Sequence, residues 1–208
     1  MRRAALLFTA LGVGLLSSAV VVTQNAPPTP PMTFFLTSAG SGEGANLGGL
    51  TGADAHCQKL AGKAGAGRTW RAYLSTQGAN AVNARDRIGK GPWHNARGTL
   101  VGQNIEEMHG MGHRFTAMTM LDEQGRMIPG SGFAPNRHDI LTGSRPDGTA
   151  YPAGDDMTCN NWTSSGTGKA RVGHHDRAAW NSTHDSQGCS QPQLQASGGD
   201  GLFYCFAQ

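Results

Sequence analysis

Apolar residues recur along this chain in short runs separated by turns rich in glycine. Four runs favour β-structure because β-branched, aromatic or alternating apolar residues lie between turn signals. These predicted strands are residues 32–37, 70–75, 138–142 and 201–206. A turn at residues 122–125 between the segments 115–120 and 126–128 predicts a hairpin.

Helical spacing is found in fewer places. Five apolar positions recur at intervals of three or four residues and predict a first helix, with Cys57 on its buried face: Ala53, Cys57, Leu60, Ala61 and Ala64. Thr51 and Asp54 resemble a capping arrangement before it. A second helix is expected over residues 79–88 and a single helical turn over residues 104–108. Residues 143–157 carry turn signals and no regular pattern, which predicts a long surface loop.

The mixture of a few helices and several short strands predicts an α+β domain. Glycine occurs 31 times and only 15% of residues are charged, which favours a fold rich in loops over a helical bundle. The net charge is +3, and no basic tract interleaved with aromatic residues is present. Nucleic acid is therefore excluded as the expected partner.

The first 26 residues have the pattern of an export signal. Arg2 and Arg3 precede an apolar run over residues 4–22, with small-residue cleavage sites near its end. Cleavage is favoured, although a run of 19 residues is also long enough for an uncleaved membrane anchor. Residues 27–31 form a proline-rich linker, so the domain is expected to cover residues 32–208 of a secreted, periplasmic or surface protein.

Four cysteines in an exported chain predict two disulfides, and the spacing leaves three pairings open. Two motifs carry chemistry that metals favour. His174, His175, Asp176 and His184 lie within a short segment and could bind zinc through imidazole and carboxylate groups. The alternative is that they form hydrogen bonds with loop backbone or face solvent. His109 and His113 have the spacing of a metal-binding pair on a helix, but Gly110 and Gly112 favour a loop there.

The order of several motifs resembles the C-type lectin-like fold, and more narrowly the endostatin-like secreted and surface proteins of bacteria. Residues 51–57 resemble the segment that carries the first-helix cysteine, and residues 155–159 the end of the long loop. Residues 180–182 resemble the Trp-Asn-Asp of the fourth strand, and residues 203–205 the last strand. The resemblance implies two helices, small antiparallel sheets, a long irregular loop region and nested disulfides joining Cys57 to Cys205 and Cys159 to Cys189.

The resemblance also implies where a ligand would bind. Sugar-binding members hold calcium through carboxylate and amide oxygens, whereas this chain has Arg145 beside Pro146 and Ser182 in place of an aspartate. We therefore expect recognition of a glycan or an extracellular protein without the usual calcium site. The expected ligand-binding residues lie in or beside the long loop: Asp147, Asp155, Asp156, Asn160, Asn161, Trp162 and Asn181.

Trp162 and Trp180 are expected to pack in the core, the alternative being that an exposed tryptophan stacks on a sugar ring. No Gly-x-Ser-x-Gly motif is present, and no catalytic constellation stands out. A binding module is therefore the favoured function. The alternatives are a zinc-dependent hydrolase that uses His174, His175 and His184, and a structural envelope protein.

Overall fold

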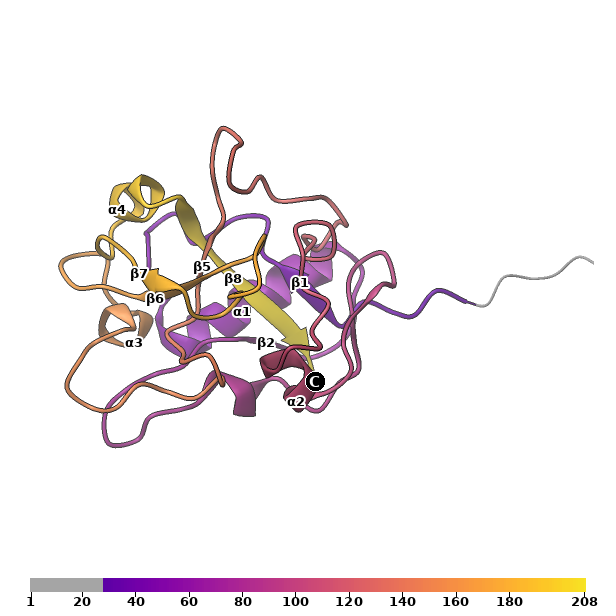
Figure 1. Cartoon of the computed structure of the whole chain (residues 1–208), viewed down its shortest axis with the longest axis horizontal. Helices are drawn as coiled ribbons and strands as arrows, with labels where there is room; N and C mark the ends of the chain where they lie inside the picture. The colour runs from indigo at the N-terminus through magenta and orange to yellow at the C-terminus, as the bar shows by residue number, and fades with distance from the viewer. Residues whose placement is uncertain (1–27) are drawn as a thin grey trace, which may run out of the picture.

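The structure, a computed structural model, describes residues 28–208, so the predicted leader lies outside the described residues. Short helices and strands are joined by long irregular segments (Figure 1). The helices are α1 (Gly49–Lys63), the 3-10 helix η1 (Ala84–Arg87), α2 (Ile105–His109), α3 (Cys159–Trp162) and α4 (Gln191–Ala196). The strands are β1 (Phe34–Leu36), β2 (Trp70–Ala72), β3 (Trp93–His94), β4 (Leu100–Gly102), β5 (Asp139–Leu141), β6 (Arg171–His174), β7 (His184–Asp185) and β8 (Gly199–Ala207).

Strand β8 is the centre of the main sheet. It pairs antiparallel with β1 and β2 and parallel with β5. Strands β6 and β7 follow β5 in antiparallel pairing, so that the order is β1-β8-β5-β6-β7 with β2 also on β8. The prediction of an α+β fold is confirmed. The prediction of small antiparallel sheets was wrong in part, because the main sheet has six strands and contains one parallel pair, β5 with β8. The separate sheet of β3 and β4 is small and antiparallel, as predicted.

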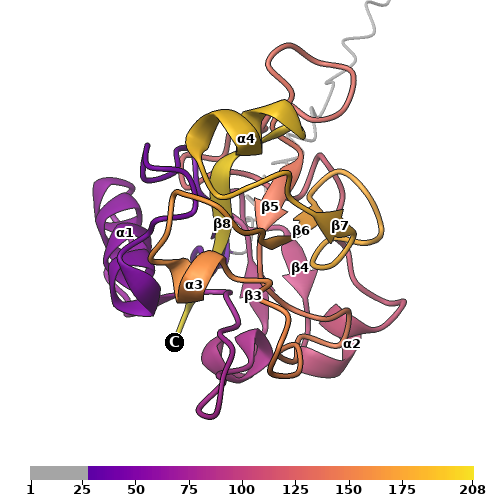
Figure 2. The same ribbon diagram turned by 90° about the vertical axis from the view of Figure 1, so that its left-hand side faces the viewer.

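Both faces of β8 are buried, and its side chains alternate between two hydrophobic clusters. Phe203 and Cys205 belong to the cluster that includes α1, whereas Tyr204 and Phe206 belong to the cluster on the opposite face. Helix α1 lies on one side of β8, and β5, β6 and β7 lie on the other side (Figure 2). The alternation of the β8 side chains between the two clusters follows from the two-residue period of a strand.

Both disulfides have the nested pairing that the resemblance implied. Cys57 of α1 bonds to Cys205 of β8, with Cα atoms 5.6 Å apart, and Cys159 bonds to Cys189, with Cα atoms 5.8 Å apart. All four cysteines are buried. Disulfides persist in oxidising compartments and are rare in the cytosol, so the two bridges indicate an extracytoplasmic protein. Within residues 28–208, no helix combines the length and apolar character needed to cross a bilayer.

The start of α1 differs from the prediction. Gly48 occupies the N-cap with φ 73°, and no side chain caps the helix. Asp54 instead accepts hydrogen bonds from Ala72 N, Arg71 Nη1 and Arg87 Nη2, at distances of 2.9, 2.6 and 2.6 Å. The capping interpretation was wrong because this carboxylate ties α1 to β2 and η1.

Three further predictions need correction. The helix expected over residues 79–88 is only the four-residue η1, and the hairpin expected around residue 124 is a turn with one isolated bridge between Leu121 and Met127. The segment 180–182, which resembles part of a strand, lies before β7. The helical turn beginning at Asn104 is confirmed, since the Asn104 side chain accepts from Glu107 N.

Two glycines of α1 give a paired test of packing. A Cβ atom at Gly52 would lie 2.0 Å from Leu47 O, whereas a Cβ at Gly62 would meet nothing within 4 Å. Gly62→Ala is expected to raise the free energy of unfolding by about 0.8 kcal/mol, since alanine is the better helix former. Gly52→Ala is expected to lower it by roughly 1–3 kcal/mol despite the same gain in propensity, because overpacking displaces backbone. Urea denaturation of both variants checks this; equal effects would contradict the packing at Leu47.

Candidate metal centre

The sheet brings together histidines that are far apart in the sequence. His138 immediately precedes β5, Asp139 is the first residue of β5, His174 ends β6 and His184 begins β7. Asp139 lies directly opposite His174 in the antiparallel pair, and His184 lies opposite Val172. Directly opposed residues of neighbouring strands place their side chains on the same face. The pairing therefore places donors from three strands beside one another.

Three imidazole nitrogens surround one carboxylate oxygen. The Nε2 atoms of His138, His174 and His184 lie 3.2, 3.1 and 3.3 Å from Asp139 Oδ1. Ligand atoms of His138, Asp139 and His174 all lie within 4.8 Å of one another. The rings of His138 and His174 are stacked at a centroid distance of 4.1 Å. The four donors, His138, Asp139, His174 and His184, are called the histidine centre below.

These short distances are not hydrogen bonds. Within the part of the chain that the structure describes, both oxygens of Asp139 and Nε2 of His174 are buried without a hydrogen-bond partner. The Asp139 side chain is only 2% exposed. A buried carboxylate without a partner is costly, because it has lost its hydration. A cation held between the carboxylate and the imidazoles would satisfy these atoms.

Burial favours the neutral imidazole at His174 and at the neighbouring His175. Burial is the largest cause that lowers the pKa of His174. Burial also lowers the pKa of His175 to about 4. Neutral imidazole is the form that binds a metal ion, since a protonated ring has no free electron pair.

Two of the four residues predicted to bind metal join the histidine centre, and two do not. His174 belongs to the group of ligand atoms within 4.8 Å of one another, and His184 lies outside that group but with its Nε2 3.3 Å from Asp139 Oδ1. His175 is fully buried and belongs to neither set. Asp176 does not belong to the histidine centre but lies beside one of its members, with Oδ1 3.6 Å from His138 Nδ1. His138 and Asp139 were missed by the sequence reasoning. Their signal is a His-Asp pair at the start of a predicted strand.

His109 and His113, which have the spacing of a metal-binding pair, make contacts with different groups. His109 ends α2, where its Nδ1 lies 2.9 Å from Ile105 O and its Nε2 lies 2.7 Å from the Tyr73 hydroxyl. Burial lowers the pKa of His109. The ring of His113 stacks against Phe115. The expected loop after α2 is confirmed, since the helix ends at His109.

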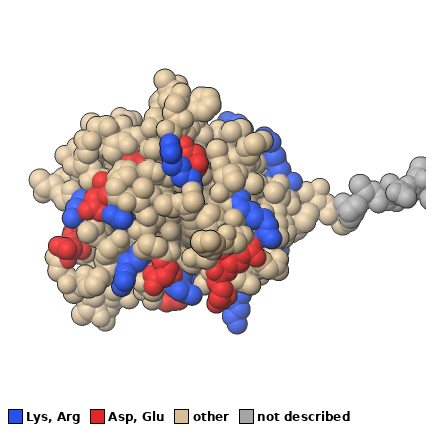
Figure 3. Space-filling model, viewed as in Figure 1, with Lys and Arg blue, Asp and Glu red and all other residues tan. Residues whose placement is uncertain are grey.

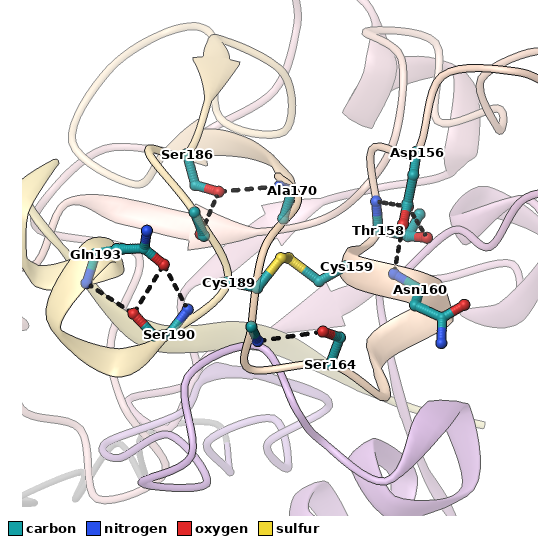
Figure 4. The surroundings of a disulfide bond; sticks show 12 residues. Asp156, Thr158, Cys159, Asn160, Ser164, Ala170, Ser186, Cys189, Ser190 and Gln193 are labelled. Atoms are coloured by element: carbon teal, nitrogen blue, oxygen red, sulfur yellow. Dashed lines mark hydrogen bonds between the residues drawn. A yellow bond between two sulfur atoms is a disulfide. The ribbon is translucent and has the colours of Figure 1, made fainter.

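Several residues expected to bind a ligand form a turn near the second disulfide. Residues 159–162 have φ angles of 47°, 56°, 54° and 66°, a left-handed conformation that asparagine tolerates better than most residues. The Asp156 carboxylate accepts from Thr158 N, Thr158 Oγ1 and Asn160 N, at 2.8, 2.9 and 2.6 Å (Figure 4). Asn161 Oδ1 accepts from Gln77 N at 2.8 Å. Asp156 and Asn161 therefore hold this turn in place.

The remaining expected ligand residues differ in exposure. Asn181 is buried, and its Nδ2 donates to Tyr73 Oη and to the carbonyls of Arg145 and Pro146. Asp147 accepts from Thr149 N and Oγ1, and these hydrogen bonds hold the pKa of Asp147 below its usual value. Asp155 is exposed. Asn181 thus anchors the long loop through the carbonyl groups of Arg145 and Pro146.

Both tryptophans of this region lie in the core. Trp162 is fully buried and its indole donates to Ser75 O at 2.8 Å. Trp180 is 2% exposed and its indole donates to Met108 O at 3.0 Å. The core interpretation is confirmed for both side chains, so neither offers a face on which a sugar could stack.

The surface around these elements carries no single dominant charge on the face that Figure 3 shows. Side chains of Lys and Arg lie among those of Asp and Glu. The chain matches no known protein-family model, and no curated protein is significantly similar to it.

Proposed function

We propose that this protein is an extracytoplasmic domain that binds one zinc ion at the histidine centre. The observation that supports the proposal best is the buried carboxylate of Asp139. Its Oδ1 has three imidazole nitrogens at 3.1–3.3 Å and no hydrogen-bond partner among the described residues. A polar group in that position calls for a partner that protein atoms do not supply.

The donor set fits zinc better than calcium. Zinc binds histidine nitrogen and carboxylate oxygen at about 2.0–2.1 Å in tetrahedral geometry, so neighbouring donors lie about 3.3 Å apart. The three distances to Asp139 Oδ1 have this length. Calcium takes roughly 6–8 oxygen ligands, and three imidazoles do not meet that need.

The number of donors favours a structural role for the ion. His138, Asp139 and His174 supply three donors of a tetrahedron, and His184, whose Nε2 lies 3.3 Å from Asp139 Oδ1, is the candidate for the fourth. A catalytic zinc would keep that fourth position for water. A zinc ion at the histidine centre would join β5, β6 and β7, two of which are very short. The hydrolase alternative requires that water, and not His184, occupy the fourth position.

At the level of the fold, we propose a C-type lectin-like domain of the endostatin-like kind. The support is the disulfide from α1 to β8 and the second disulfide beside the long loop. Recognition of a glycan or an extracellular protein by the loop region stays a prediction. If the region does bind a partner, the exposed Asp155 is better placed for contact than Asn181 or Trp162.

Zinc titration of the purified metal-free domain tests the proposed function. Wild type is expected to bind one zinc ion per chain by calorimetry, and His174→Ala is expected to lose this binding because it removes a ligand from the middle of the histidine centre. His113→Ala is the matched control, since His113 lies on Phe115 away from the centre. A wild-type protein that takes up no zinc, or a His174→Ala variant that binds as well as wild type, would refute the site.

A further inference from the structure

Asp176 lies between the histidine centre and the loop of residues 129–137, which leads directly into His138 and β5. This loop projects from the body of the fold (Figures 1 and 2). Near its tip, Phe133 is 67% exposed. The loop therefore combines an accessible aromatic side chain with a covalent connection to a metal ligand.

One oxygen of Asp176 holds the loop. Its Oδ2 accepts from Ser131 N at 2.8 Å. A Cβ atom at Gly130 would lie only 2.5 Å from the same oxygen, so the carboxylate packs directly against the loop backbone.

The other oxygen of Asp176 faces a ligand of the histidine centre. Its Oδ1 lies 3.6 Å from Nδ1 of His138 and has no hydrogen-bond partner among the described residues. The side chain is 11% exposed. A metal on Nε2 of His138 leaves the ring proton on Nδ1, and a small shift of the Asp176 carboxylate would bring Oδ1 within hydrogen-bond distance of that proton. Such outer carboxylates fix the ring and strengthen metal binding.

We propose, on the basis of the proposed function, that Asp176 positions His138 for the metal and links metal occupancy to the conformation of the loop 129–137. With zinc bound, His138 donates to Oδ1 and the fixed carboxylate holds Ser131 through Oδ2. Without zinc, the proton of His138 is free to reside on either nitrogen, and the contact to Asp176 weakens. Metal binding then controls how rigid the loop 129–137 is, and with it the position of the exposed Phe133 side chain.

The loop has a second attachment that serves as a control. Arg137 Nε lies 3.1 Å from Asp200 Oδ2, and the other oxygen of Asp200 accepts from Gln191 and Gln195. Among the hydrogen bonds and ion pairs of residues 28–208, the Asp200 side chain is joined to the same loop and to none of the four donors. Asp200→Asn therefore perturbs the loop without touching the histidine centre.

The test compares wild type, Asp176→Asn and Asp200→Asn in metal-free, zinc and cobalt forms. Asp176→Asn is expected to raise the Kd for zinc about 10–100-fold, the usual effect of losing an outer carboxylate. It should also change the visible absorption bands of the cobalt form, which a role in loop packing alone would not alter. Asp200→Asn should leave the Kd and the cobalt bands unchanged. In wild type, zinc should slow hydrogen exchange of amides 130–137, and Asp176→Asn should remove that protection.

The outcomes separate the two proposals. If wild type binds no zinc, the proposed function and this inference both fail. If wild type binds zinc but Asp176→Asn has the same Kd and cobalt spectrum, only the positioning role fails. If zinc leaves the exchange of amides 130–137 unchanged in wild type, the link to the loop is wrong, whatever the variants show.

Discussion

Replacing Cys57 and Cys205 together by alanine is expected to lower the free energy of unfolding by about 5 kcal/mol, from the chain entropy released when a bridge of this separation is lost. The bond spans 148 residues and joins α1 to the central strand. Domains of this size are stable by only about 5–15 kcal/mol, so the variant should be near the limit of folding at 37 °C. Urea denaturation under non-reducing conditions measures the loss.

The second disulfide is the control for this prediction. It spans 30 residues, for which the same argument gives roughly 3.5 kcal/mol. Removing Cys159 and Cys189 together should also increase hydrogen exchange chiefly around α3 and the segment before α4. If loss of the Cys159–Cys189 bridge lowers the free energy of unfolding more than loss of the Cys57–Cys205 bridge, the view that β8 and α1 depend on their covalent link is contradicted.

Zinc at about 1,000 times its Kd is expected to raise the free energy of unfolding of wild type by about 4 kcal/mol, because an ion that binds only the folded state stabilises it by mass action. A chelator should reverse the gain. Asp139→Asn should show a much smaller gain, since a neutral amide replaces a carboxylate ligand. Thermal and urea unfolding with and without zinc measure both effects.

The metal-free form of Asp139→Asn distinguishes a ligand from a structural residue. Both oxygens of Asp139 are buried without hydrogen-bond partners among the described residues, so replacing the charged group should cost nothing when zinc is absent. We therefore expect the metal-free variant to be at least as stable as metal-free wild type. If Asp139 instead serves only to hold the histidines, the metal-free variant will be less stable, and the metal site loses its main support.

Local patterns in the sequence were sufficient for the elements with strong periodicity. The helical spacing around Cys57 and the apolar run before Cys205 placed both residues in buried elements. Strands β6 and β7 were missed because β6 has one large apolar residue, Val172, and β7 consists of His184 and Asp185. Neither carries the alternation that marks a strand.

The histidine centre could be predicted only in part because it depends on strand register. Asp139 lies opposite His174 across a separation of 35 residues, and no local pattern specifies that pairing. His174 and His175 looked equivalent in the sequence. His174 is the last residue of β6 and joins the centre, whereas His175 lies just beyond the strand, fully buried and outside the group of ligand atoms.

The central position of β8 has a consequence for the time at which the protein can fold. Strands β1, β2 and β5 all pair with residues 199–207, and β1 lies about 170 positions earlier in the chain than its partners. The main sheet cannot form before residues 199–207 have left the ribosome, so β1, β2 and β5 are synthesised well before their shared partner. Folds dominated by such distant pairings also form slowly. Cys205 belongs to the same strand, so the disulfide to Cys57 also depends on residues that are synthesised after β1, β2 and β5.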